Sequence, residues 1–301
     1  MQIHVKASAK INLFLNIKEK RPDDFHEIRS VLLPVRLYDR ISIEQQDRNI
    51  ETVVANSIEP FGVSWSLPIE DSEENLTTRA ARLLKKVTGY RGGASIFLEK
   101  RIPIGAGLGG GSSNAAAVLK GLNRLWKTEL SREELKHIGS QLGSDIPAFI
   151  HGGVVYMEGR GEQVKSIAQH SGLNLWFILV NPGFGISTAD IYSRYNVPLT
   201  FRKQEAKFRT LIEGLTKDSC KKISYGLFNA LQKTVFRKYP ILEMIKNKLE
   251  KAGALGVLLS GTGSTIFGLV WDAHHGHEVK EQLVKALGCP LWIKIVKAFP
   301  Q

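Results

Sequence analysis

The sequence predicts an α+β protein of two domains, each built from a sheet with helices on one face. The chain of 301 residues is about twice as long as a common single domain. Short apolar runs separated by turn residues alternate with longer segments of helical periodicity. A second series of strands and helices begins near residue 174. We therefore expect one domain over residues 1–160 and a second over residues 161–301.

The first predicted strand, residues 9–17 (AKINLFLNI), alternates between an apolar and a polar face. Its apolar face holds Ile11, Leu13, Leu15 and Ile17, and its opposite face holds Lys10, Asn12, Phe14 and Asn16. Strands are also expected at residues 25–37 and 40–45. A helix capped near Ser72 or Asn75 ends at Gly89, and a strand follows at residues 94–100.

The rest of the first domain is predicted to hold two helices and a strand. The helices cover residues 114–126 and a segment ending near Gly143, which begins at the capping box of Ser131 and Glu134. The strand covers residues 152–159. The second domain is expected to contain strands at residues 173–180, 255–260, 265–271 and 291–296. Its helices are expected at residues 188–195, 225–238, 240–252 and 275–287, and residues 196–220 are polar and poorly periodic.

The composition is that of an ordinary globular protein with a basic surface. The net charge of +12 and the pI near 9.6 call for a polyanionic partner or reflect solubility. The basic clusters lack interleaved aromatic residues, so a nucleotide substrate explains the charge better than a nucleic acid partner. No apolar run is long enough to span a membrane, and residues 1–10 lack an apolar signal core. We expect a cytoplasmic protein with no membrane partner.

The two cysteines and the three clustered histidines carry little chemistry. Cys220 and Cys289 form neither a disulfide framework nor a metal knuckle. His274, His275 and His277 have no cysteine partner, so a solvated turn is favoured over a metal site. Nothing in the sequence indicates an oligomeric state.

A glycine-rich loop, PIGAGLGGGSSNAA at residues 103–116, separates a predicted strand from a predicted helix. Its glycines fit the pattern G-x-G-x-x-G, which several nucleotide sites share. A Walker A loop requires Lys after the last glycine, but Gly110 is followed by Gly111 and Ser112. A Rossmann site requires an acidic residue about 20 positions later, at the end of a strand. The acids available there, Glu129, Glu133 and Glu134, lie around a helix start.

The remaining interpretation of this loop is a phosphate cradle made of backbone N–H groups. Glycines let the backbone approach an anion closely, and the N-terminus of the following helix adds partial positive charge. A flexible linker or a packing turn is the alternative.

Three further segments could carry chemistry. Lys10 and Asn12 are expected side by side on the outward face of their strand, where a solvated lysine is the alternative. Asp145 is expected at a turn, because Pro147 biases Ile146 away from helix. It would need a cation or a hydrogen-bond donor there, unless it forms an Asx turn or a helix cap. The turn SGTGS at residues 260–264 is either a plain hairpin or a backbone surface that closes over the first glycine loop.

Six segments together resemble the GHMP kinase superfamily, in order, over about residues 7–270. They are SAKINLFLNI, RPDDFHEI, PIGAGLGGGSSNAA, GSDIPAF, NPGFGIST and SGTGSTIF. The segments AKINLFL and FHEI are similar to those of the members that act on 4-diphosphocytidyl-2-C-methyl-D-erythritol (CDP-methylerythritol) in the non-mevalonate isoprenoid pathway.

The resemblance implies a first domain like ribosomal protein S5 domain 2, a ferredoxin-like second domain and an active site between them. It implies transfer of the γ-phosphoryl group of ATP to the 2-hydroxyl of CDP-methylerythritol, with Lys10 and Asp145 as the catalytic pair. Mg²⁺ is expected to accompany ATP, with Ser113 as a candidate ligand. Two other functions remain open: a homoserine- or mevalonate-type GHMP kinase, and a non-catalytic RNA-binding protein.

The resemblance also implies the binding residues, position by position. ATP would be held by Asn75, Lys100, Pro103, Ile104, Gly105, Ala106, Gly107, Leu108, Gly109, Gly110, Gly111, Ser112 and Ser113. The acceptor would be held by Asn12, Phe25, His26, Thr188 and Tyr192. Relatives commonly have Tyr where this chain has Phe25, but stacking on a base needs only the ring faces.

Overall fold

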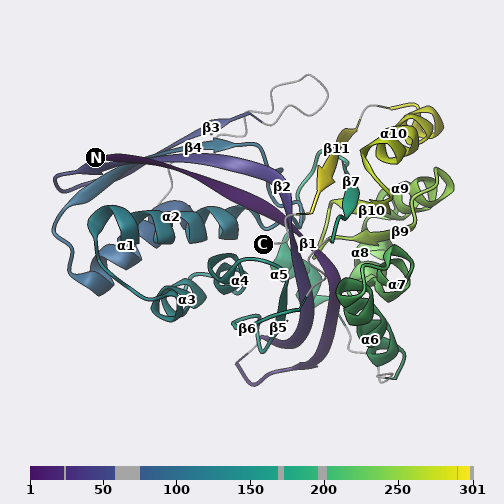
Figure 1. Ribbon diagram of the computed structural model, residues 1–301, viewed down its shortest axis with the longest axis horizontal. Coiled ribbons are helices and arrows are strands. Elements are labelled where there is room, and N and C mark those ends of the chain that lie inside the picture. The colour runs from purple at the N-terminus through teal and green to yellow at the C-terminus, as the bar shows by residue number, and fades with distance from the viewer. Residues whose placement is uncertain (24, 58–74, 169–172, 196–201, 290, 299–301) are drawn as a thin grey trace.

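The computed structural model describes residues 1–23, 25–57, 75–168, 173–195, 202–289 and 291–298. Within these residues the chain forms two sheets with helices packed on them (Figure 1). No helix among them is long and apolar enough to cross a membrane.

The first sheet has the order β3-β4-β2-β1-β8, and β5 joins it through β2 and carries β6 on its other edge. Its strands are β1 (Gln2–Lys20), β2 (His26–Gln46), β3 (Ile50–Asn56), β4 (Gly93–Lys100), β5 (Val155–Glu158), β6 (Gln163–Ser166) and β8 (Phe228–Asn229). Its helices are α1 (Leu76–Thr88), α2 (Gly110–Trp126), α3 (Arg132–Ser140) and α4 (Ile146–His151). Helices α1 and α2 lie side by side under one face of this sheet (Figure 1).

The second sheet has the order β11-β7-β10-β9, and every neighbouring pair is antiparallel. Its strands are β7 (Trp176–Asn181), β9 (Gly256–Leu259), β10 (Ile266–Val270) and β11 (Trp292–Lys297). The other elements are α5 (Thr188–Ser193), α6 (Arg202–Thr216), α7 (Cys220–Gly226), α8 (Gln232–Lys238), α9 (Pro240–Lys251) and α10 (Ala273–Leu287). With helices after β7 and after β10, this is the ferredoxin-like strand order that the resemblance implied.

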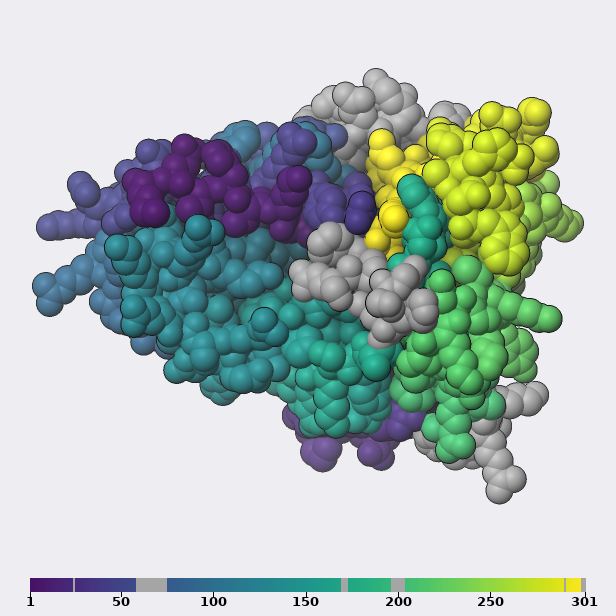
Figure 2. Space-filling model, in the orientation of Figure 1, coloured from purple at the N-terminus to yellow at the C-terminus, as the bar shows by residue number. Residues whose placement is uncertain are grey.

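The two sheets share a hydrophobic core, so the halves of the molecule are tightly joined. Buried residues of β1 and β2 pack against β7 and β10 in one cluster that includes Ile11, Leu33, Phe177 and Phe267. In Figure 2 the purple and blue N-terminal colours lie mainly at the left and the green and yellow C-terminal colours at the right of one continuous body. Strand β6 lies beyond residue 160 but pairs with β5, and the boundary between residues 160 and 161 stays a prediction.

Strand β1 departs from the alternation that the sequence predicts. Phe14 was expected on the polar face, yet it is fully buried in the core between the sheets together with Leu13. The register against β2 shifts between Asn12 and Phe14, which marks a β-bulge. A bulge puts one extra residue into a strand and reverses the alternation beyond it. The prediction for Phe14 was therefore wrong.

Most helix boundaries agree with the predictions. Asn75 caps α1 by accepting from the backbone N–H of Thr77, and Gly89 ends that helix; Ser72 lies outside the described residues. The capping box of Ser131 begins α3. By contrast, α2 begins inside the glycine loop at Gly110, and the segment predicted as poorly periodic contains helix α6. The single helix predicted over residues 225–238 was wrong, because β8 pairs with β1 there and α8 begins only at Gln232.

Candidate active site

The two glycine segments lie back to back, which decides between the two interpretations of the SGTGS turn. A Cβ placed on Gly107 would lie 2.0 Å from the carbonyl oxygen of Ser260. The Ser260 hydroxyl donates to the Gly107 carbonyl at 2.9 Å, and the backbone N–H of Thr265 donates to the Ala106 carbonyl at 3.1 Å. The turn is therefore a backbone surface that closes over the glycine loop.

The side chains of Lys10 and Lys100 reach the N-terminus of α2. A Cβ on Gly109 would lie 3.0 Å from carbons of the Lys10 side chain, and a Cβ on Gly110 would lie 3.0 Å from the Lys100 ammonium nitrogen. Glycine at both positions leaves room for these side chains. The start of α2 therefore combines free backbone N–H groups with two cations, which suits a polyphosphate.

Lys10 is the centre of a buried polar chain. Its ammonium lies 3.3 Å from an Asp145 carboxylate oxygen and donates to the Asn12 side-chain oxygen at 2.5 Å. The Asn12 amide donates to the Ser30 hydroxyl at 2.9 Å, and that hydroxyl donates to the Phe14 carbonyl. These hydrogen bonds hold the ammonium and the carboxylate in a defined orientation.

Lys10 and Asn12 are each only 4% exposed, although the sequence predicted an outward-facing pair. The outward face of β1 is here covered by α2 and by the glycine turn, since a Cβ on Gly261 would lie 3.3 Å from the Asn12 oxygen. The alternative of a solvated lysine is therefore wrong.

Asp145 occupies the N-cap position of α4, and Pro147 lies in the first turn of that helix. The expectation that Pro147 keeps Ile146 out of a helix was wrong, because proline is well tolerated at a helix start. The Asp145 side chain makes no capping hydrogen bond. Its carboxylate is instead paired with Lys10 and keeps about a third of its surface exposed. It is thus available to a bound molecule.

Aromatic side chains gather where β1 and β2 are joined. The rings of His26 and Tyr192 lie 5.3 Å apart, and the Arg160 guanidinium lies 4.8 Å from the centre of the Phe25 ring. Burial, followed by the charge of Lys20, lowers the pKa of His26. Burial, followed by the charge of Asp145, raises the pKa of Tyr192. His26 is therefore neutral at pH 7, which suits a flat, uncharged ligand group.

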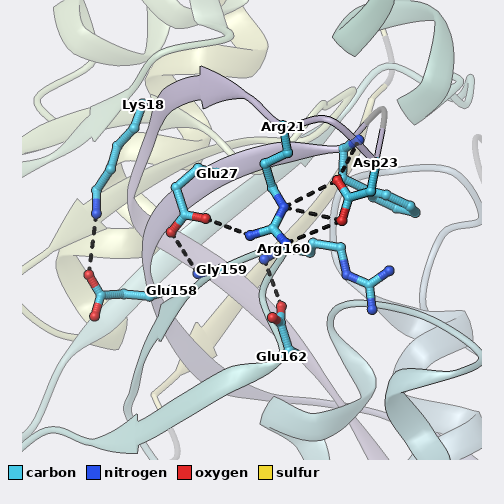
Figure 3. Close-up of polar contacts among 9 residues, drawn as sticks. Lys18, Arg21, Asp23, Glu27, Glu158, Gly159, Arg160 and Glu162 are labelled. Atoms are coloured by element: carbon cyan, nitrogen blue, oxygen red, sulfur yellow. Dashed lines mark hydrogen bonds and ion pairs between the residues drawn. The ribbon is translucent and has the colours of Figure 1, made fainter.

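Polar contacts fix this end of the hairpin (Figure 3). Arg21 pairs with Asp23 and Glu27, and Glu27 accepts a hydrogen bond from the backbone N–H of Gly159. The backbone N–H of Ile28 donates to the Gly159 carbonyl at 2.8 Å. The strand pair β5 and β6 thus supports the segment that carries Phe25 and His26.

A cavity of about 1420 Å³ connects these groups. Most of the sequence-predicted site residues line it: Lys10, Asn12, Phe25, His26, Asn75, Lys100, Pro103, Ile104, Gly105, Ala106, Gly107, Gly109, Gly110, Gly111, Ser112, Asp145, Thr188 and Tyr192. Leu108 and Ser113 do not line it and are 1% and 3% exposed. Leu108 instead accepts the backbone N–H of Lys10 through its carbonyl.

Sequence reasoning missed several residues of this cavity. Ser30 and Arg160 line it, and Thr262 meets Thr188 through hydroxyls 3.1 Å apart. Ser30 could have been found only from the pairing of β1 with β2, which places it opposite Leu15 and within reach of the Asn12 amide. Among the described residues no group of three or more His, Cys, Asp or Glu side chains could hold a metal ion, and His274 to His277 lie at the start of α10.

Comparison with known proteins gives a consistent result. The family model of the GHMP kinases N terminal domain matches residues 75–153, and that of the GHMP kinases C terminal domain matches residues 211–288. The 4-diphosphocytidyl-2-C-methyl-D-erythritol kinase of Bacillus pumilus is 39% identical over 270 residues, which cover 90% of this chain and 89% of the relative. The enzyme of the same name from Pelotomaculum thermopropionicum is 39% identical, with 93% of each chain covered.

Solved structures agree with this assignment. A crystal structure of 4-(cytidine 5'-diphospho)-2C-methyl-D-erythritol kinase matches with a TM-score of 0.76 and 30% identity, covering 98% of this chain and 99% of that one. The homoserine kinase of Cytophaga hutchinsonii also reaches a TM-score of 0.76, with 99% of this chain and 95% of that chain covered, but at 18% identity it shares only the fold. This chain therefore belongs to the 4-diphosphocytidyl-2-C-methyl-D-erythritol kinase family of the GHMP kinases.

Proposed function

We propose that this protein transfers the γ-phosphoryl group of ATP to the 2-hydroxyl of CDP-methylerythritol. One observation carries the proposal: a single cavity joins a backbone phosphate cradle, the Lys10 and Asp145 pair, and an end lined by His26 and Tyr192. A kinase for a small polar acceptor such as homoserine or mevalonate has no need of the aromatic end. The relatives named above support the same acceptor.

The glycine loop fits the phosphates of ATP. At Gly109 and Gly110 a side chain would displace the two lysines from the start of α2, so glycine is required for backbone and cations to meet one anion. Mg²⁺ would shield the β- and γ-phosphates and complete its shell with water, as this ion commonly does. Ser112 lines the cavity, whereas Ser113 is buried in α2. We therefore assign the role of candidate Mg²⁺ ligand to the Ser112 hydroxyl in place of Ser113.

Asp145 orients the acceptor hydroxyl. Complete transfer of the hydroxyl proton to Asp145 before the reaction would cost about 16 kcal/mol. The pKa of an alcohol is near that of water, about 15.7, which is roughly 12 units above the pKa of a normal carboxyl group. A loose transition state needs little charge on the attacking oxygen. Asp145 therefore holds the hydroxyl in line and accepts its proton late.

Lys10 stabilises the charge that moves during transfer. Its ammonium contacts Asp145 and lies beside Gly109, so it reaches both the carboxylate and the position of the γ-phosphate. Asn12 and Ser30 fix its direction. A cation held in place before reaction stabilises the transition state without reorganisation.

The aromatic end binds the cytosine base. Neutral His26 and the ring of Tyr192 offer flat faces and a hydrogen-bonding edge, and Phe25 is 48% exposed beside them. Such a site prefers an uncharged base to an ammonium or carboxylate group.

The test compares turnover with binding. Asp145→Asn should lower kcat by about 10²–10⁴-fold, the usual effect of losing a general base, while an ATP analogue still binds. Asp190→Asn is the matched control, because that carboxylate pairs with Arg194 and Lys238 on the exposed surface of α5. Near-native turnover of Asp145→Asn would refute the assigned role.

A substrate panel tests the acceptor. ATP consumption is measured with CDP-methylerythritol, homoserine and mevalonate in parallel. Turnover with homoserine or mevalonate but not with CDP-methylerythritol would contradict the proposal. Salt-sensitive RNA binding without any ATP consumption would favour a non-catalytic protein.

A further inference from the structure

Asp39 is a buried carboxylate for which the mechanism above has no role. It lies on β2, is 0% exposed, and one of its oxygens accepts the backbone N–H groups of Arg101 and Ile102 at 2.6 and 2.8 Å. Its other oxygen pairs with the Lys100 ammonium. A buried carboxylate with three donors is well satisfied, and each donor belongs to the segment that leads into the glycine loop.

Lys100 connects this carboxylate to the phosphate cradle. It ends β4, is 5% exposed and lines the cavity. Its ammonium nitrogen lies 3.0 Å from the position that a Cβ on Gly110 would take, in the first turn of α2. A lysine ammonium has three donors, so pairing with Asp39 leaves donors that can face the cavity.

Asp39 is the charged side chain that faces this ammonium from the neighbouring strand β2. Glu99 and Arg101, which flank Lys100 in the chain, pair with each other at 2.6 Å. From the other side come Lys10, at the adjacent Gly109, and the positive end of α2. Burial lowers the pKa of Lys100, and the charge of Asp39 opposes that effect.

We propose that Asp39 is a positioning residue, which holds the Lys100 ammonium under the first turn of α2 so that it binds the phosphates of ATP. The proposal rests on the function proposed above, in that the anion is the nucleotide's polyphosphate. Asp39 acts twice, because the same carboxylate also fixes the backbone at Arg101 and Ile102, where the glycine loop begins. It does not touch the nucleotide itself.

Asp39→Asn separates the two tasks. The asparagine oxygen can still accept the two backbone N–H groups, but its amide is a donor and cannot pair with an ammonium. We expect the affinity for a non-hydrolysable ATP analogue to fall about tenfold or more, the effect of losing one charge-assisted hydrogen bond. The KM for CDP-methylerythritol should stay unchanged, because the cytosine end lies elsewhere in the cavity.

The pH dependence of analogue binding gives a second readout. Only protonated Lys100 binds phosphate, so affinity falls as the pH rises through the pKa of Lys100. Without the Asp39 charge, that pKa is lower, and the loss of affinity should move to lower pH in Asp39→Asn. Lys100→Met should remove this pH-dependent step. Lys207→Met is the matched control: its ammonium is partly buried on backbone carbonyls of Tyr225 and Leu227, away from the cavity.

A double-mutant comparison decides the result. If Asp39 acts through Lys100, then Asp39→Asn should have no further effect on analogue binding in the Lys100→Met background. Additive effects of the two changes, or wild-type affinity in Asp39→Asn, would overturn the proposal. If Asp39→Asn does not fold, the test rests on Lys100→Met. An unchanged affinity of that variant for the ATP analogue, together with an unchanged pH profile, would overturn the proposal.

The binding assay separates this proposal from the proposed function. A wild-type protein that binds the ATP analogue but does not phosphorylate CDP-methylerythritol would refute the acceptor, and the Asp39 comparison would still be measured. A wild-type protein that binds no analogue would overturn both.

Discussion

Replacing Gly107 with alanine is expected to destabilise the protein by about 2–5 kcal/mol, because two backbone segments meet at this residue. The φ angle of Gly107 is +74°, and a left-handed conformation costs an alanine about 1–2 kcal/mol. The new Cβ would lie 2.0 Å from the Ser260 carbonyl oxygen and 3.0 Å from backbone atoms of Gly263. Backbone cannot rotate away as a side chain does, so overpacking adds about 1–3 kcal/mol.

Two control variants separate these contributions. Gly89 has a φ of +67° and nothing within 4 Å of its Cβ position, so Gly89→Ala measures the conformational cost alone, about 1–2 kcal/mol. Gly111 lies in the same loop, and its Cβ would meet Leu76 at an ordinary 3.4 Å. Gly111→Ala should therefore leave the free energy of unfolding unchanged or raise it by up to about 1 kcal/mol, the helix preference of alanine.

The assay is equilibrium unfolding in urea, followed by circular dichroism, with the slope compared between variants. Gly107→Ala should also lose ATP-analogue binding, since the glycine loop must move away from the turn. If Gly107→Ala were no more destabilising than Gly89→Ala, the glycine loop and the SGTGS turn would not be packed together, and the derived site would be wrong.

Three further outcomes are expected. Asn229→Ala should lower the free energy of unfolding by about 2–4 kcal/mol in urea titrations, because the Asn229 amide donates to the buried carbonyls of Leu259 and Gly261; a loss below 0.5 kcal/mol would contradict that role. Burial and nearby cations lower the pKa of His151, so below about pH 6.5 the unfolded chain binds more protons and stability falls. His151→Gln should flatten the dependence of the unfolding midpoint on pH between 7.5 and 5; an unchanged slope would refute this. Phe25→Ala should raise the KM for CDP-methylerythritol several-fold with an unchanged KM for ATP, and a matching rise for ATP would place the base elsewhere.

Local patterns were sufficient for much of the fold. The cap at Asn75 and the capping box at Ser131 depend on neighbouring residues alone, and both helices begin where those patterns indicate. The alternation of β1 was read correctly up to Asn12 and failed at Phe14, because a bulge is set by pairing with β2. Helix α6 was not predicted because most of its residues are polar. Its narrow apolar face is recognised only where it packs against the core beside β1.

The candidate site divides in the same way. The phosphate cradle after β4 was predicted from the sequence alone, since glycine spacing and a helix start are local properties. The sequence also supplied Lys10 and Asp145 as candidates, although only the family resemblance paired them. Their 3.3 Å separation, the burial of Asn12 and the covering of the glycine loop by the SGTGS turn were decided by the tertiary structure. Asp39 became visible only there, because its donors lie at and just after the end of β4, more than 60 residues later in the chain. Charges separated in sequence interact only when the sheets place them within a few ångströms, and no local pattern encodes that distance.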